Sequence, residues 1–103
     1  MELKTDFGKY NVVLKRSSYR NNGVLAVLME TDDGEPFATL TVNIEGWDSL
    51  PHDMSFVDTN NCDWAVKFLK DNKIAESMGV YASSGFCSYP LYKFDLSKIE
   101  EDI

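Results

Sequence analysis

The sequence predicts an α+β fold in which an antiparallel sheet of about five strands carries a single helix on one face. Two observations support this fold: two hairpin-turn signals follow one another in the N-terminal half, and only one segment has helical periodicity. We expect a β-meander over residues 10–44, a helix over about residues 62–71 and a C-terminal hairpin over residues 80–96. Because the chain has 103 residues, we expect one domain, residues 1–103, around one core.

The meander begins with residues 10–16, where apolar side chains alternate with a mixed face as in a half-buried strand. Asn22-Gly23 then supplies the positive φ angles of a two-residue hairpin turn. Residues 24–29 are apolar on both faces, so this strand should return antiparallel in the centre of the sheet. Asp32-Asp33-Gly34 predicts a second turn. Residues 37–44 should then form one strand, with the inward positions Ala38, Leu40, Val42 and Ile44 and the outward positions Phe37, Thr39, Thr41 and Asn43.

The helix follows residues 46–55, which have the composition of a loop. Its apolar stripe consists of Trp64, Ala65, Phe68 and Leu69. Asn60 or Asn61 is a suitable cap for the first N–H groups. A helix of roughly ten residues is not stable alone, so it should pack on the sheet.

The C-terminal hairpin turns at Ser83-Ser84-Gly85. Pro90 cannot donate a hydrogen bond to a neighbouring strand, so it indicates a sheet edge or a bulge. Residues 97–103 should form an acidic tail.

Charge is distributed unevenly along the chain. The segment between Asn21 and Val66 contains no Lys or Arg but nine carboxylates, namely Glu30, Asp32, Asp33, Glu35, Glu45, Asp48, Asp53, Asp58 and Asp63. The formal net charge of −7 repels the nucleic-acid backbone and anionic lipid. We therefore expect a protein partner of basic character, and neither direct nucleic-acid binding nor membrane binding.

The proposed meander divides these acids between two ends of the sheet. Glu30, Asp32, Asp33 and Glu35 form an acidic turn at one end. Glu45, Asp48 and Asp53 should reach the other end, where Arg16 and Arg20 would neutralise them. This division is less suited to mimicry of a nucleic-acid duplex than a single acidic ridge would be.

Most chemistries lack the residues that they need. His52 is the sole histidine, and the only cysteines, Cys62 and Cys87, are 25 positions apart, so we expect no metal site and no cofactor. Asp32-Asp33-Gly34-Glu35 resembles part of a calcium loop but lacks its closing Glu. With no secretory signal in the sequence, two cysteines favour a reduced, cytoplasmic protein.

Two functional alternatives depend on particular side chains. Cys62 would lie at the helix N-terminus, where the helix dipole lowers the pKa of a thiol, and His52 would be its base in a small Cys-dependent enzyme. The C-terminal aromatics would suit a stacking platform for single-stranded nucleic acid. Lys93 is the only basic residue among them, so a core role is favoured.

Three short segments resemble a known family: Phe37–Asn43, Phe56–Asn61 and Ser84–Pro90. This is a small uncharacterised family of Firmicutes and other gut bacteria, a domain of unknown function often carried on conjugative elements, plasmids and prophages. The likeness extends from Phe7-Gly8-Lys9-Tyr10 to Phe94-Asp95-Leu96 and includes no catalytic signature. The resemblance implies an accessory protein of a mobile element.

The leading functional hypothesis is a non-enzymatic interaction module that binds a basic host or defence protein. The competing hypotheses are the Cys62 enzyme and an assembly or regulatory subunit without charge mimicry. The expected interaction surface is the loop and helix entry, consisting of Trp47, Asp48, Asp53, Asp58, Asn60 and Asn61. Asp58 and the two asparagines also suit a purely structural role at the helix entry.

Overall fold

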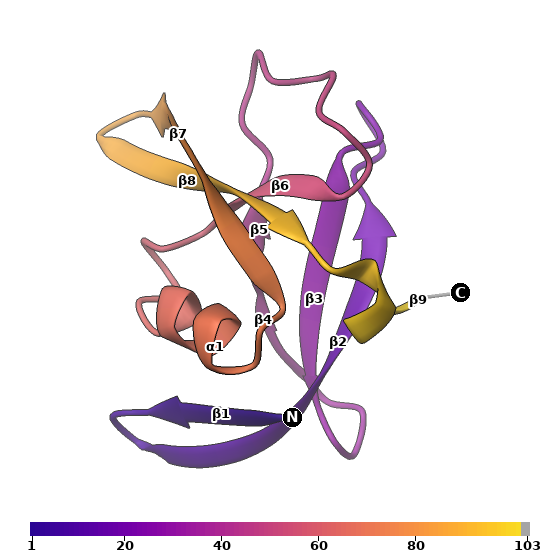
Figure 1. The fold of residues 1–103 in the computed structure, drawn as a ribbon, viewed down its shortest axis with the longest axis vertical. Helices are drawn as coiled ribbons and strands as arrows, with labels where there is room; N and C mark the ends of the chain where they lie inside the picture. Colours follow the sequence, from indigo (N-terminus) through magenta and orange to yellow (C-terminus); the bar gives the residue numbers. More distant parts are fainter. Residues whose placement is uncertain (102–103) are drawn as a thin grey trace.

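A computed structural model describes residues 1–101, and it confirms the predicted fold class. The architecture is mostly β, with two mainly antiparallel sheets of five and four strands and one short helix (Figure 1). The prediction of a single sheet was wrong, because the chain passes from one sheet to the other in the middle of the predicted strand 37–44. Within residues 1–101, no helix is long and apolar enough to cross a membrane.

The first sheet contains the expected meander and two strands that were not predicted. Its strands are β1 (Glu2–Thr5), β2 (Gly8–Ser18), β3 (Leu25–Thr31), β4 (Pro36–Thr39) and β9 (Glu100–Glu101). The order is β1-β2-β3-β4, and β9 runs parallel beside β2. The long β2 pairs with β1 through its first half and with β3 through its second half.

Both predicted turns join antiparallel strands, but the first is longer than expected. The connection runs from Tyr19 to Val24, and the Tyr19 N–H donates to the Val24 carbonyl at 2.9 Å. Asn22 accepts from the Val24 N–H, so its side chain shapes a wider loop instead of a two-residue turn. The second turn is confirmed, with Gly34 at a φ of 89°.

The second sheet has the order β5-β6-β8-β7. Its strands are β5 (Thr41–Val42), β6 (Met54–Val57), β7 (Ala75–Ser84) and β8 (Cys87–Phe94). β7 begins before the predicted residue 80 and bulges between Ser77 and Tyr81. Pro90 pairs with Tyr81 next to this bulge, and the pairing of β8 with β6 reaches only Leu91.

A corner at Leu40 and Thr41 joins the two sheets. The Leu40 N–H donates to the Val27 carbonyl of β3 at 2.9 Å, and the Leu40 carbonyl accepts from the Asp58 N–H at 2.8 Å. The Thr41 hydroxyl accepts from the Val27 N–H at 3.1 Å and lies 2.9 Å from the Tyr19 hydroxyl. Thr41 is therefore buried, contrary to the prediction that it faces outward, because its hydroxyl satisfies a buried backbone donor.

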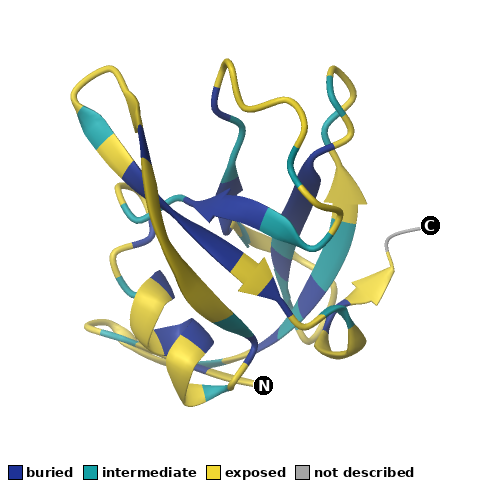
Figure 2. Cartoon of the chain, turned by 45° about the horizontal axis from the view of Figure 1, so that its top comes forward, coloured by how far each residue is buried: buried dark blue, intermediate teal, exposed yellow. Residues whose placement is uncertain are grey.

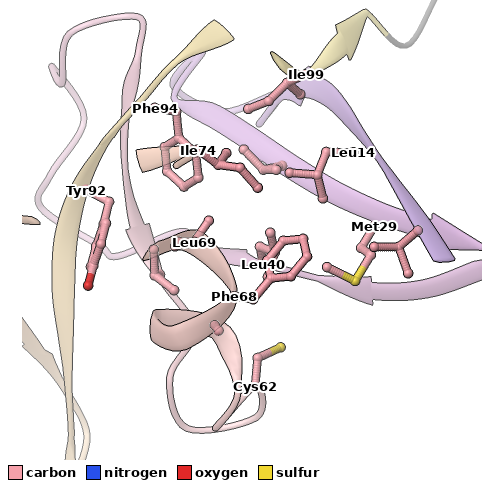
Figure 3. Close-up of a cluster of buried hydrophobic side chains, with 14 of the residues drawn as sticks. Leu14, Met29, Leu40, Cys62, Phe68, Leu69, Ile74, Tyr92, Phe94 and Ile99 are labelled. Atoms are coloured by element: carbon pink, nitrogen blue, oxygen red, sulfur yellow. The ribbon is translucent and has the colours of Figure 1, made fainter. Parts of the chain in front are cut away.

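The main core lies between the first sheet, the second sheet and the helix α1 (Ala65–Asp71). Figure 3 shows Phe68 and Leu69 of α1 beside Leu40 of the corner. The helix is shorter than predicted, and neither Asn60 nor Asn61 caps it; Trp64 is the N-cap residue and makes no side-chain capping bond. Tertiary packing of its buried face therefore stabilises the helix.

A smaller core covers the opposite face of the second sheet. It contains Ile44, Phe56, Ala82, Tyr89 and Leu91, with Leu50 packed against them. Ile44 and Leu50 belong to the connection between β5 and β6, so this long loop is held on the sheet by its own apolar side chains.

The C-terminal segment, which includes the start of the predicted acidic tail, folds back onto β2. After a 3₁₀ helix η1 (Leu96–Lys98), Ile99 is buried and β9 follows. Arg16 binds Glu101 at 2.7 Å, and the Lys15 Nζ lies 3.9 Å from Glu100. Residues 102 and 103 of the predicted tail lie outside the described residues. The expected pairing of Arg16 with Glu45, Asp48 or Asp53 was wrong, because β9 provides its partner.

Replacing Thr41 by Val should lower the free energy of unfolding by about 1–3 kcal/mol, because the buried Val27 N–H loses its acceptor. Tyr19→Phe leaves that bond intact, so it should cost less, about 1 kcal/mol. Urea denaturation of both variants measures the two costs. A Thr41→Val protein as stable as the wild type would show that the hydroxyl does not hold the corner.

Candidate functional site

Trp47 and Asp48 lie in an exposed acidic loop, residues 45–49. The Trp47 ring packs edge-on against Phe56 of β6 at a centroid distance of 5.2 Å, yet the side chain keeps 38 % of its surface exposed. The Asp48 carboxylate accepts from the Asn22 side-chain amide at 3.1 Å. The acidic loop is thus attached to β6 and to the β2–β3 connection, while an aromatic surface and carboxylates face solvent.

Asp58 and Asn61 form a turn before α1, and no described contact joins them to the acidic loop. The Asp58 carboxylate accepts from the Asn61 N–H at 3.2 Å and from its side-chain amide at 2.9 Å. Asn60 is exposed at the same turn. These bonds support the structural role for Asp58 and Asn61.

The acidic turn lies at the β3–β4 connection, as predicted. The Thr31 hydroxyl donates to Asp33 and accepts from the Glu35 N–H, so the turn is closed by its own side chains. Asp32, Asp33 and Glu35 are exposed. Within the described chain, His, Cys, Asp and Glu side chains do not gather in groups of three that could hold a metal ion.

None of the nine carboxylates between Asn21 and Val66 forms an ion pair among residues 1–101. The ion pairs in this part of the chain use Glu2, Asp71, Glu100 and Glu101. The central acids therefore keep their charge available to a partner.

A groove of about 940 Å³ lies between α1, the start of β7 and the end of β8. Ile74, Tyr92 and Phe94 are among its apolar lining residues. Its charged lining residues are Lys70, Lys73, Lys93, Asp53, Glu76 and Asp95. Three lysines oppose three carboxylates, so the groove has no marked preference for an anionic or a cationic ligand. Asp53, another residue of the predicted interaction surface, lines this groove together with His52, whereas Trp47 does not. Sequence reasoning missed the groove because separate segments line it.

Cys62 has the properties of a core residue. Its side chain is only 4 % exposed, and its thiol donates to the Thr39 carbonyl at 3.7 Å. Burial, together with the nearby carboxylates of Asp58 and Asp63, raises the pKa of this thiol to about 11. The expected lowering of the pKa by the helix dipole was wrong, since α1 begins at Ala65, after Cys62.

Cys62 should therefore resist alkylation by iodoacetamide at pH 8, where the folded thiol remains protonated. Because the pKa of Cys62 is higher in the folded protein than the ordinary thiol value of 9.0, the protonated thiol contributes to the free energy of unfolding below pH 9. This contribution is lost as the pH rises toward 11. Mass spectrometry of the Cys87→Ser variant measures the labelling of Cys62 alone. The Cys62→Ser variant, in which only the half-buried Cys87 can react, is the matched control. Faster labelling of Cys62 than of Cys87 in folded protein would contradict this assignment.

Comparison with curated proteins and with solved structures gives no match. A family model described as a domain of unknown function (DUF4313) matches residues 13–102, which include both sheets apart from β1 and the start of β2. The resemblance to a family of unknown function is thereby confirmed. Because the match covers most of the chain, this protein belongs to the DUF4313 family.

Proposed function

We propose that this chain is a non-enzymatic protein-binding module whose partner is a basic protein, contacted through the acidic loop. The observation that carries the proposal is the absence of ion pairs at all nine central carboxylates within the described chain. An acidic surface without internal counter-charges attracts a basic partner and accelerates its association.

Trp47 would add binding energy to the charge attraction of the acidic loop. Tryptophan is enriched among the residues that dominate protein–protein binding energy. The Trp47 ring already packs against Phe56, so little side-chain freedom is lost when a partner covers its exposed part. Glu45 and Asp48 flank the ring in the same exposed loop and would bind Lys or Arg at the rim of the contact.

An accessory role on a mobile element, as the family resemblance implies, is part of this proposal. A host or defence protein with a basic surface would fit the acidic loop. The division of the acids between the acidic loop, the Asp58 turn and the acidic turn supports binding to a local basic patch over imitation of a continuous duplex.

The Cys62 enzyme has less support. A cysteine nucleophile acts as the thiolate, whereas the pKa of Cys62 is raised and its side chain is buried. No described contact joins Cys62 to His52. We therefore retain the binding module as the function that the geometry supports best.

Affinity capture from a bacterial lysate tests the proposal with Trp47→Ala and with the paired variant Glu45→Gln, Asp48→Asn. The wild type should retain a basic protein at low salt and release most of it at high salt, because screening weakens exposed charge pairs. Both variants should capture at least about fivefold less, since each removes part of one contact.

Two matched controls locate the contact. Asp32→Asn with Asp33→Asn removes the same number of charges from the acidic turn and should retain the partner. Asp58→Ala should lower the free energy of unfolding by about 1 kcal/mol while still binding. Thermal melting must show that the Trp47 and Asp48 variants are folded. Unchanged capture by folded variants of the acidic loop would refute its role.

A further inference from the structure

The outer edge of β7 has no neighbouring strand. β7 is the last strand of the β5-β6-β8-β7 sheet, and its residues 76–81 and 83–84 are exposed. Figures 1 and 2 show the far half of the β7–β8 hairpin projecting beyond the rest of the molecule. An open edge presents backbone N–H and C=O groups to which another strand can bind.

This edge lacks the charged protection that soluble proteins usually give to an exposed strand. Residues 77–92 contain no Asp, Glu, Lys or Arg, although 26 % of the chain is charged. The hairpin also exposes large apolar side chains, namely Met78, Val80, Tyr81 and Phe86, with Tyr81 at 64 %. Lysine and proline are the residues that normally prevent edge pairing, and the outer strand has neither.

The bulge limits where another strand can pair. Gly79, at a φ of 73°, interrupts β7 between Ser77 and Tyr81. Beyond it, Tyr81–Ser84 pairs regularly with Cys87–Pro90. The far half of β7 is therefore the straight section of the edge that remains free to pair.

We propose that the far half of β7 pairs antiparallel with the same strand of a second copy, joining two four-stranded sheets across a two-fold axis. A second copy matches this edge in character, because its own far half of β7 is equally uncharged and equally exposes Tyr81. Two molecules of net charge −7 repel one another through most of their surface, but this edge is uncharged. If the two-fold axis lies anywhere between residues 78 and 84, antiparallel pairing places Glu76 of one copy opposite one of residues 80–92 of the other. None of these residues is charged, so no like charges meet. A basic foreign strand would find Glu76 as its only counter-charge on β7.

The pairing also covers the exposed apolar side chains. Tyr81 lies directly on the straight section, and Val80 and Phe86 flank it, so a second hairpin would remove part of their surface from water. The contact is short, so association should depend on protein concentration. This inference is independent of the proposed function, because the acidic loop belongs to a different segment.

Sedimentation velocity over a wide concentration range tests the self-pairing. The 11.7 kDa chain should shift toward twice that mass as concentration rises. Added salt should strengthen the dimer, because salt screens the repulsion between two acidic molecules. Salt weakens binding of a basic partner, so the two proposals give opposite salt dependences and can fail separately.

Tyr81→Lys with Ser83→Lys should raise the dissociation constant by about tenfold or more, because two-fold pairing brings the new charges together. Phe7→Lys is the matched control, since Phe7 is a highly exposed aromatic outside the β7–β8 hairpin and its replacement should leave the dimer unchanged. Circular dichroism confirms that each variant is folded.

Amide hydrogen exchange of the wild type supplies a test that needs no variant. Protection at residues 81–84 should rise with concentration, as outward N–H groups become bonded to the second copy. A wild-type protein that stays monomeric, or a dimer that the paired lysines do not weaken, would overturn the proposal. Concentration-independent exchange at residues 81–84 would do the same.

Discussion

The structure depends on the corner at Leu40 and Thr41, where the chain leaves β4 of the first sheet and enters β5 of the second. Leu40 bonds to β3 on one side and to Asp58 on the other, and the Thr41 hydroxyl satisfies the Val27 N–H. Ser55 adds a second link, because its buried hydroxyl donates to the Leu25 carbonyl at 2.7 Å. These bonds hold the sheets together over the main core and leave no buried side-chain N or O atom without a partner among the described residues.

The corner also determines where the charges lie. Because the chain enters the second sheet at Thr41, the long β5–β6 connection covers the second sheet, places Trp47 against Phe56 and leaves Asp48 exposed. At the same time, β9 occupies Lys15 and Arg16 on β2. Arg16, which was expected to neutralise Glu45 and Asp48, therefore pairs with Glu101 instead, and neither acid of the loop forms an ion pair within residues 1–101.

Local patterns allowed much of the fold to be predicted, whereas long-range pairings escaped prediction. Alternation and turn residues located the meander and the C-terminal hairpin, since both depend on neighbours in sequence. Residues 37–44 alternate without interruption, so nothing local indicates that strand pairing changes at Leu40. The Arg16–Glu101 pair joins positions 85 residues apart, and composition alone cannot select such a partner. In the candidate site, Trp47 and Asp48 lie together as expected, but Asp58 and Asn61 bond to each other in a separate turn.

Amide hydrogen exchange of the wild-type protein tests the central role of the corner most directly. If the corner holds both sheets, the Val27 and Leu40 amides open only by global unfolding. Their opening free energy then equals the free energy of unfolding measured with urea. Exchange of these two amides as rapid as that of the exposed acidic loop, in a protein whose core amides remain protected, would contradict this account.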